Sequence, residues 1–99
     1  MKNYSISILT PVFNQGKYIA ETMESVLSQD YPNLEYLVLD DGSTDGTLNI
    51  IRQYAERIRW QTQTNMGESA TVNKGIKMLN GEIVGIVNGD DPLLPGILQ

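Results

Sequence analysis

The sequence predicts an α/β fold with a mainly parallel sheet and helices on both faces. Two segments, "LEYLVLD" and "EIVGIV", are apolar at nearly every position, which is typical of parallel strands covered on both sides. Between such strands, apolar residues recur at helical spacing, so strands and helices alternate along the chain. Because ligands of these sheets bind beyond the carboxyl ends of the strands, we expect a functional site at that edge.

The first half of the chain contains two expected strands and two expected helices. "SISILTPV" predicts a strand that ends near Pro11, since proline lacks the N–H that a ladder needs. Residues 17–29 carry apolar side chains at helical spacing and predict a helix, and "LEYLVLD" predicts the second strand. Ser43 or Thr44 is expected to cap the second helix.

The second half continues this alternation. A short strand is expected near "RIRWQT", and a helix is expected from about Glu68 to a glycine cap at Gly81. The inward side chains of that helix are expected to be Val72, Ile76 and Leu79. "EIVGIV" is expected to form a strand buried on both faces, and "PLLPGILQ" starts like a further helix. We therefore expect the chain to be the front part of a longer protein.

The composition limits the classes of function. The 99 residues with 40% hydrophobic content fit one compact domain or part of one. The net charge of -5, with Lys and Arg scattered singly, argues against nucleic acid and direct membrane contact. Without Cys or His, a metal would be held by carboxylates, carbonyls and water, which suits Mg or Mn. The sequence has no secretory signal and no membrane-spanning run, so we expect a cytoplasmic location.

Two pairs of aspartates follow two different expected strands. Asp40 and Asp41 end "LEYLVLD", and Asp90 and Asp91 come shortly after "EIVGIV". One pair alone fits a polar turn better than a metal site, but a second pair at another strand end reverses that preference. Adjacent carboxylates at a strand end can hold a hard divalent cation that also binds substrate phosphates. Asp40 can instead accept a hydrogen bond from a nucleotide base or a ribose hydroxyl.

Other residues lie near the same expected edge. Phe13 follows the first strand and fits a place beside a planar base as well as a place in the core. Asn65, Gly67 and Asn73 flank or enter the third helix, where amides can reach sugar or phosphate oxygens and glycines can simply permit tight turns. The glycine spacings of P-loop and dinucleotide-binding proteins are missing from the sequence, which argues against ATP hydrolysis and dinucleotide redox chemistry.

Four motifs occur in an order that resembles a known family. They are "TPVFN", "SVLSQDYPNLEYLVLDDGSTDGT", "NMGESATVNKGI" and "NGEIVGIVNGDD", and they cover nearly the whole chain. This combination resembles the inverting family 2 glycosyltransferases with the GT-A fold. The resemblance implies a Rossmann-like nucleotide-binding half, a nucleotide-diphosphate sugar as donor, with a UDP-sugar favoured, and Mn or Mg as cofactor.

The resemblance also implies roles for particular residues. Asp40 is expected to contact the base of the donor, with Asp41 beside it. "NGDD" matches the acidic metal motif of the family, so Asp90 and Asp91 are the expected metal ligands. The expected nucleotide-sugar-binding residues are Pro11, Phe13, Asn14, Asp40, Asp41, Asn65, Gly67, Asn73 and Asp90.

Two positions depart from the family pattern. Asn88 stands where many relatives have the first Asp of the metal motif, and Val72 stands where many carry Arg. The general base and the acceptor half of the family lie beyond the metal motif. Residues 1–99 are therefore expected to be the N-terminal donor-binding part, inactive alone, of an enzyme of polysaccharide or glycan synthesis. The whole protein is expected in the cytoplasm, with a peripheral position at the inner face of the membrane as the alternative. An exposed sheet edge favours a homo-oligomer.

Two other functions stay open at this point. A non-catalytic nucleotide-binding module would use the same pocket at Asp40, and a nucleotidyltransferase would have similar metal carboxylates. The lack of a Gly-rich loop with Lys or Arg near the first strand counts against the nucleotidyltransferase. The sequence downstream of Gln99 distinguishes these functions, because a base and an acceptor segment indicate transfer whereas a regulatory domain indicates sensing.

Overall fold

The computed structural model describes residues 4–90 and contains one four-stranded sheet in which all paired strands are parallel. The strand order across the sheet is β3-β2-β1-β4. The strands are Ile6–Val12 (β1), Leu34–Asp40 (β2), Arg59–Thr62 (β3) and Ile83–Ile86 (β4). The expected parallel sheet is confirmed, including its short third strand.

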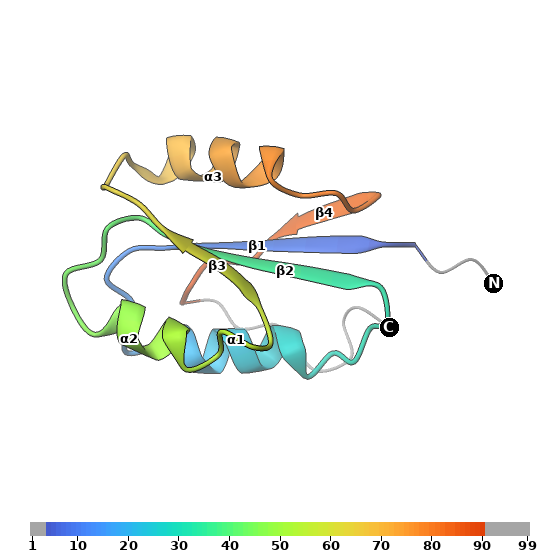
Figure 1. The fold of residues 1–99 in the computed structure, drawn as a ribbon, viewed down its shortest axis with the longest axis horizontal. Helices are drawn as coiled ribbons and strands as arrows, with labels where there is room; N and C mark the ends of the chain where they lie inside the picture. The colour runs from blue at the N-terminus through green and yellow to red at the C-terminus, as the bar shows by residue number, and fades with distance from the viewer. Residues whose placement is uncertain (1–3, 91–99) are drawn as a thin grey trace.

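Helices cover both faces of this sheet, as expected. They are Ile19–Leu27 (α1), Thr47–Arg52 (α2) and Glu68–Lys77 (α3). Figure 1 shows α1 and α2 below the sheet and α3 above it. The chain runs outward from β1 through β2 to β3 and then returns across the sheet to β4, on the other side of β1. In sheets of this kind ligands bind where the strand order reverses, which is here at the carboxyl ends of β1 and β4.

The core has two parts, because successive side chains of a strand point to opposite faces. On the face of α1 and α2, its buried members include Ile8, Ile19, Met23, Val26, Tyr36, Val38 and Ile51. On the face of α3, the buried members are Leu9, Leu37 and Leu39, packed against Val72, Met78 and Leu79. The two central strands are thus covered on both sides, as the apolar run in β2 predicted.

β4 differs from the expectation of burial on both faces. Its residues Ile83, Val84 and Ile86 are 47%, 41% and 43% exposed. Within residues 4–90, β4 pairs with β1 along one side and lies at the edge of the sheet. An apolar run does not reveal whether a strand is central or at an edge, and this is why the expectation was wrong. The helix expected in "PLLPGILQ" lies outside the described residues.

The helices are shorter than the sequence predicts. α1 begins at Ile19 and ends at Leu27, inside the expected range of 17–29. Ser43 and Thr44 do not cap α2, because the helix begins at Thr47 and the Asp45 carboxylate accepts the Thr47 N–H at 2.9 Å. None of the helices between residues 4 and 90 has the length and apolar character needed to cross a membrane.

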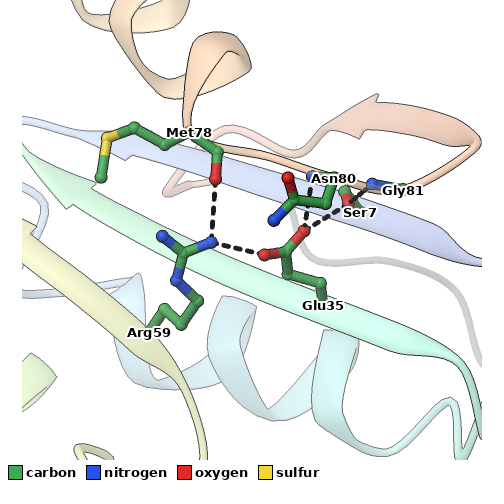
Figure 2. A network of polar contacts seen from close by, with 6 residues as sticks. All are labelled: Ser7, Glu35, Arg59, Met78, Asn80 and Gly81. Carbon is green, nitrogen blue, oxygen red and sulfur yellow. Dashed lines mark hydrogen bonds and ion pairs between the residues drawn. The ribbon is translucent and has the colours of Figure 1, made fainter.

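A polar network fixes the end of α3 against the amino ends of the strands (Figure 2). Glu35 on β2 accepts hydrogen bonds from the Ser7 hydroxyl at 2.7 Å and from the Asn80 N–H at 2.9 Å. Its other carboxylate oxygen pairs with Arg59, which also donates to the Met78 carbonyl at 2.9 Å. Arg59 thus supplies a hydrogen bond to a carbonyl group at the end of α3, where the sequence predicted a glycine cap instead.

Gly81 lies in the turn beyond α3 and does not cap the helix, which ends at Lys77. The Gly81 N–H donates to the Ser7 hydroxyl at 2.7 Å. A Cβ at Gly81 would lie 2.4 Å from Ser7 Oγ and 2.6 Å from the Ser7 backbone nitrogen. Glycine is required because the turn approaches β1 closely. Ile76, expected to face inward, is 43% exposed, because the core contacts of α3 come from other positions.

We expect Gly81→Ala to lower the free energy of unfolding by about 1–3 kcal/mol, because the added methyl group would overlap the backbone of β1. Gly46→Ala is the matched control, since nothing lies within 4 Å of a Cβ there, and it should change stability by less than about 1 kcal/mol. Urea denaturation followed by circular dichroism measures both variants. Equal losses of stability in the two would contradict the close approach at Gly81.

Candidate functional site

A pocket of about 470 Å³ opens at the carboxyl ends of β1 and β2 and beside the turn that follows β4. Its walls come from the loops after β1 and β2, from the segment that enters α3, and from residues 88–90. The pocket therefore lies at the sheet edge where the two aspartate pairs were expected to meet. The prediction that "ISILTPV", "EYLVLD" and "EIVGIV" form adjacent parallel strands is confirmed, with β1 between β2 and β4. Asp40 at the end of β2 and Asp90 after β4 lie at the same edge of the sheet, as predicted.

Six of the expected binding residues line this pocket: Pro11, Phe13, Asp41, Asn65, Gly67 and Asp90. Phe13 is 46% exposed, so its ring belongs to the pocket wall and not to the core. Of the two places that the sequence allowed for Phe13, the core and the neighbourhood of the pocket, the structure shows the second. A contact between these residues and a nucleotide stays a prediction.

Asp41 is firmly anchored in the pocket wall. Its N–H donates to the Val12 carbonyl at 2.9 Å, which extends the pairing of β1 and β2 by one residue. The side chain is almost fully buried, and its two oxygens accept four hydrogen bonds at 2.8–3.2 Å. The donors are Gln63 Nε2, Asn65 Nδ2, the Met66 N–H and the Gly67 N–H. Asp41 thus fixes the loop that leads from β3 into α3.

The hydrogen bonds to Asp41 also set its charge. Burial raises the pKa of Asp41, but bonds from the Gln63 amide and from the N–H groups of Met66 and Gly67 outweigh burial and lower the pKa below its ordinary value. The carboxylate is therefore ionised at neutral pH. An ionised acceptor in a pocket wall can bind N–H or O–H donors of a ligand.

Asp40 lies one residue earlier and does not line the pocket. Its Oδ2 accepts hydrogen bonds from the Thr62 hydroxyl at 2.8 Å and from the Ser43 N–H at 3.3 Å. Its Oδ1 is buried without a hydrogen-bond partner in the described part of the chain. Because consecutive residues of a strand point to opposite faces, two adjacent aspartates do not share one environment. Of the two, only Asp41 lines the pocket, and a contact between Asp40 and a base stays a prediction.

Asn14 and Asn73, two further expected binding residues, also lie off the pocket wall. Asn14 adopts a φ of 52°, and its Oδ1 accepts the N–H groups of Thr44 at 2.7 Å and Asp45 at 3.3 Å. Asn73 is exposed on α3. The side chain of Asn14 therefore joins two loops.

Other lining residues were not among the expected binding residues: Val12, Gln15, Glu68, Thr71 and Asn88. Glu68 and Thr71 share one side of the first turn of α3, a spacing that identifies them once the start of the helix is known. Gln15 Oε1 is buried without a partner among residues 4–90, and a Cβ at Gly89 would lie 2.2 Å from it. Sequence reasoning could not find this contact, because the two residues are far apart in the chain.

The candidate metal ligands of the pocket are oxygen atoms. Asp90 and Asn88 line it, whereas Asp91, the second expected ligand, lies outside the described residues. Among the residues described, no group of three Asp, Glu, His or Cys side chains is placed to hold an ion. The pocket residues described include three acidic side chains and no Lys or Arg. This oxygen-rich, negatively charged set fits Mg or Mn and does not fit a metal that prefers nitrogen or sulfur ligands.

Comparison with known proteins identifies the family. The profile described as glycosyl transferase family 2 matches residues 7–99. The chain belongs to this family. It is 40% identical over 98 residues to the glycosyltransferase GlyG of Streptococcus pneumoniae serotype 4, an alignment that covers 95% of this chain and 33% of GlyG.

Two solved structures confirm the GT-A glycosyltransferase fold. The mannosyltransferase PcManGT from Pyrobaculum calidifontis, in complex with GDP-Man and Mn²⁺, matches with a TM-score of 0.84 and 27% identity over 97% of this chain and 30% of PcManGT. S. aureus TarS 1-349, in complex with UDP-GlcNAc, matches with a TM-score of 0.79 and 35% identity over 88% of this chain and 27% of TarS 1-349. The chain spans about a third or less of the length of these relatives.

Asp41→Asn should destabilise the protein at pH 7 by about 1–3 kcal/mol, because an amide cannot accept all four hydrogen bonds. The folded-state pKa of Asp41 is lowered, so its carboxylate stabilises the fold above the unfolded pKa of about 3.9. This stabilisation is lost as the pH falls through the folded pKa. Urea denaturation from pH 7 to pH 3 should show the two proteins converging below about pH 4. A constant difference over that range would contradict the role of the charge.

Proposed function

We propose that this chain is the N-terminal donor-binding part of a glycosyltransferase that transfers a sugar from a nucleoside diphosphate to an acceptor hydroxyl with inversion. The observation that carries the proposal is the pocket at the carboxyl edge of the sheet, lined by Phe13, Asp41 and Asp90. Membership of glycosyl transferase family 2 supports the reaction class. The greater length of the relatives supports an acceptor half that lies outside residues 1–99.

The nucleotide base fits between Phe13 and Asp41 in this proposal. The aromatic ring offers an apolar surface to a planar base, and the carboxylate accepts a base N–H. Since each Asp41 oxygen already accepts two hydrogen bonds, the base N–H would replace the longest, from Asn65 Nδ2 at 3.2 Å. The Asn65 amide could then donate to the ligand. A UDP-sugar is the favoured donor, supported by the UDP-GlcNAc complex of TarS.

The diphosphate would enter a pocket that lacks a basic side chain among its described residues. Asp41, Glu68 and Asp90 would repel it, and Val72, where many relatives carry Arg, packs into the core below α3. Neutralisation therefore falls to a divalent cation, which Asp90 and Asp91 would hold. A bound Mn or Mg would stabilise the charge of the departing diphosphate, and Mn²⁺ is present with GDP-Man in PcManGT.

The residues of this chain bind and orient the donor, while the acceptor is activated elsewhere. Inversion requires a base on the side of the anomeric carbon opposite the leaving diphosphate. Carboxylates that hold the metal lie on the diphosphate side and cannot also remove the acceptor proton. We therefore place the base beyond Gln99 and expect residues 1–99 to be inactive alone.

UDP should bind the full-length protein in the presence of Mn²⁺ and roughly tenfold or more weakly in EDTA, because only the cation offsets the acidic pocket. Asp90→Asn should remove most of the gain from Mn²⁺. Asn88→Ala is the matched comparison and should remove less, since Asn contributes only a neutral oxygen. Isothermal titration calorimetry with UDP and GDP measures both the metal dependence and the base preference.

Two results of that titration would count against the proposal. Failure of both UDP and GDP to bind in Mn²⁺ would reject the nucleotide site. Equal UDP affinity in Mn²⁺ and in EDTA would reject the metal role of Asp90.

A further inference from the structure

The loop after β1 and the loop after β2 are joined by many hydrogen bonds beside the pocket. The residues involved are Asn14–Gly16 in the first loop, Ser43–Asp45 in the second, and Thr47 at the start of α2, and we call them the interloop cluster. Most of these groups do not line the pocket, so the cluster supports the pocket wall from outside.

Three consecutive backbone N–H groups of the first loop donate into the cluster. They run from Asn14 to Ser43 Oγ at 2.9 Å, from Gln15 to Thr47 Oγ1 at 3.0 Å, and from Gly16 to Asp45 Oδ2 at 3.2 Å. These N–H groups are engaged by side chains and are not available to a phosphate. Their role is to fix the path of the loop that carries Phe13.

The second loop is held in return by Asn14 and Asp45. Asn14 occupies the left-handed region that asparagine tolerates, and its Oδ1 accepts the N–H groups of Thr44 and Asp45. Asp45 Oδ1 accepts both the N–H and the hydroxyl of Thr47, and the same hydroxyl accepts the Gln15 N–H. The bond from the Thr47 hydroxyl lowers the pKa of Asp45, so the carboxylate is ionised at neutral pH.

We propose that Asn14 and Asp45 are positioning residues for the donor nucleotide, which hold Phe13 and Gln15 in the pocket wall before the nucleotide binds. The inference rests on the proposed function and deepens it. Phe13 directly precedes the cluster, Gln15 belongs to it, and both line the pocket. A loop that is ordered before binding avoids the entropy loss that a mobile loop would add to the free energy of binding.

Gln15 extends this support to the opposite wall of the pocket. Its buried Oε1 lies so close to Gly89 that a Cβ at that position would be 2.2 Å away. The placement of the first loop therefore also limits where the turn at residues 88–90 can lie. Displacing the cluster should disturb the base side and the metal side of the pocket together.

The Glu35 network of Figure 2 provides a matched control. It also joins separate segments through a carboxylate, but at the amino ends of the strands and outside the pocket lining. Burial raises the pKa of Glu35, but hydrogen bonds from Asn80, Ser7 and Arg59 outweigh burial and lower the pKa below its ordinary value. This carboxylate is therefore charged at neutral pH as well. Glu35→Gln should lower the melting temperature and leave nucleotide affinity unchanged.

Variants can separate positioning from general stability. Asp45→Asn keeps one oxygen for Thr47 but loses the acceptor of the Gly16 N–H. Asn14→Gly tolerates the same backbone conformation and loses the side-chain acceptor. Each should weaken UDP binding to the full-length protein in Mn²⁺ by about two- to tenfold, the loss expected for one or two hydrogen bonds. Thr47→Val should weaken binding similarly, and Thr47→Ser, which retains the hydroxyl, should restore it.

Calorimetry with UDP, together with amide hydrogen exchange of the free protein, tests the inference. We expect exchange at residues 14–16 to be faster in Asp45→Asn than in the wild type and unchanged in Glu35→Gln. Wild-type affinity in both Asp45→Asn and Asn14→Gly, or an equal loss of affinity in Glu35→Gln, would overturn the positioning role. Failure of the wild type itself to bind UDP or GDP would instead refute the proposed function, and the inference with it.

Discussion

The buried carboxylate of Asp41 is the interaction on which the rest of the pocket depends. Asp41 directly follows β2 at the carboxyl edge of the sheet. The parallel register, which pairs Val12 with Asp40, fixes its position relative to the end of β1. The loop after β3 then has to bring the N–H groups of Met66 and Gly67 to that carboxylate. α3 begins directly after Gly67, so the position of Asp41 also decides where the first turn of α3 meets the pocket.

The two edges of the sheet have different charge balances. At the amino edge, Glu35 pairs with Arg59, and the surrounding polar groups satisfy both. At the carboxyl edge, Asp41, Glu68 and Asp90 line one pocket without Lys or Arg among the described lining residues. This excess of carboxylates at one edge supports the divalent cation that we propose for the pocket. Because all the paired strands are parallel, the Glu35 network that supports the fold lies at one edge of the sheet and the pocket lies at the opposite edge.

The sequence predicts the main elements of this fold because β1 and β2 are buried on both faces and carry matching apolar runs. It does not predict the exposure of β4, since burial there depends on strand order and not on local composition. The aspartate pairs predict the edge of the sheet at which the pocket lies. Which member of a pair faces the pocket depends on the exact residue at which β2 ends, and pattern does not fix that residue. The contacts of Asn14 join loops about thirty residues apart and arise only in the folded chain.

The central claim is that a nucleoside diphosphate and a divalent cation bind together between Phe13, Asp41 and Asp90. The most direct measurement is a titration of the ¹⁵N-labelled full-length protein with UDP and diamagnetic Mg²⁺, followed by amide chemical shifts. We expect the largest shifts at Phe13, at residues 65–68 and at residues 88–90, with little change around Glu35 at the opposite edge. Shifts that spare the pocket residues, or that concentrate at the Glu35 edge, would contradict the account.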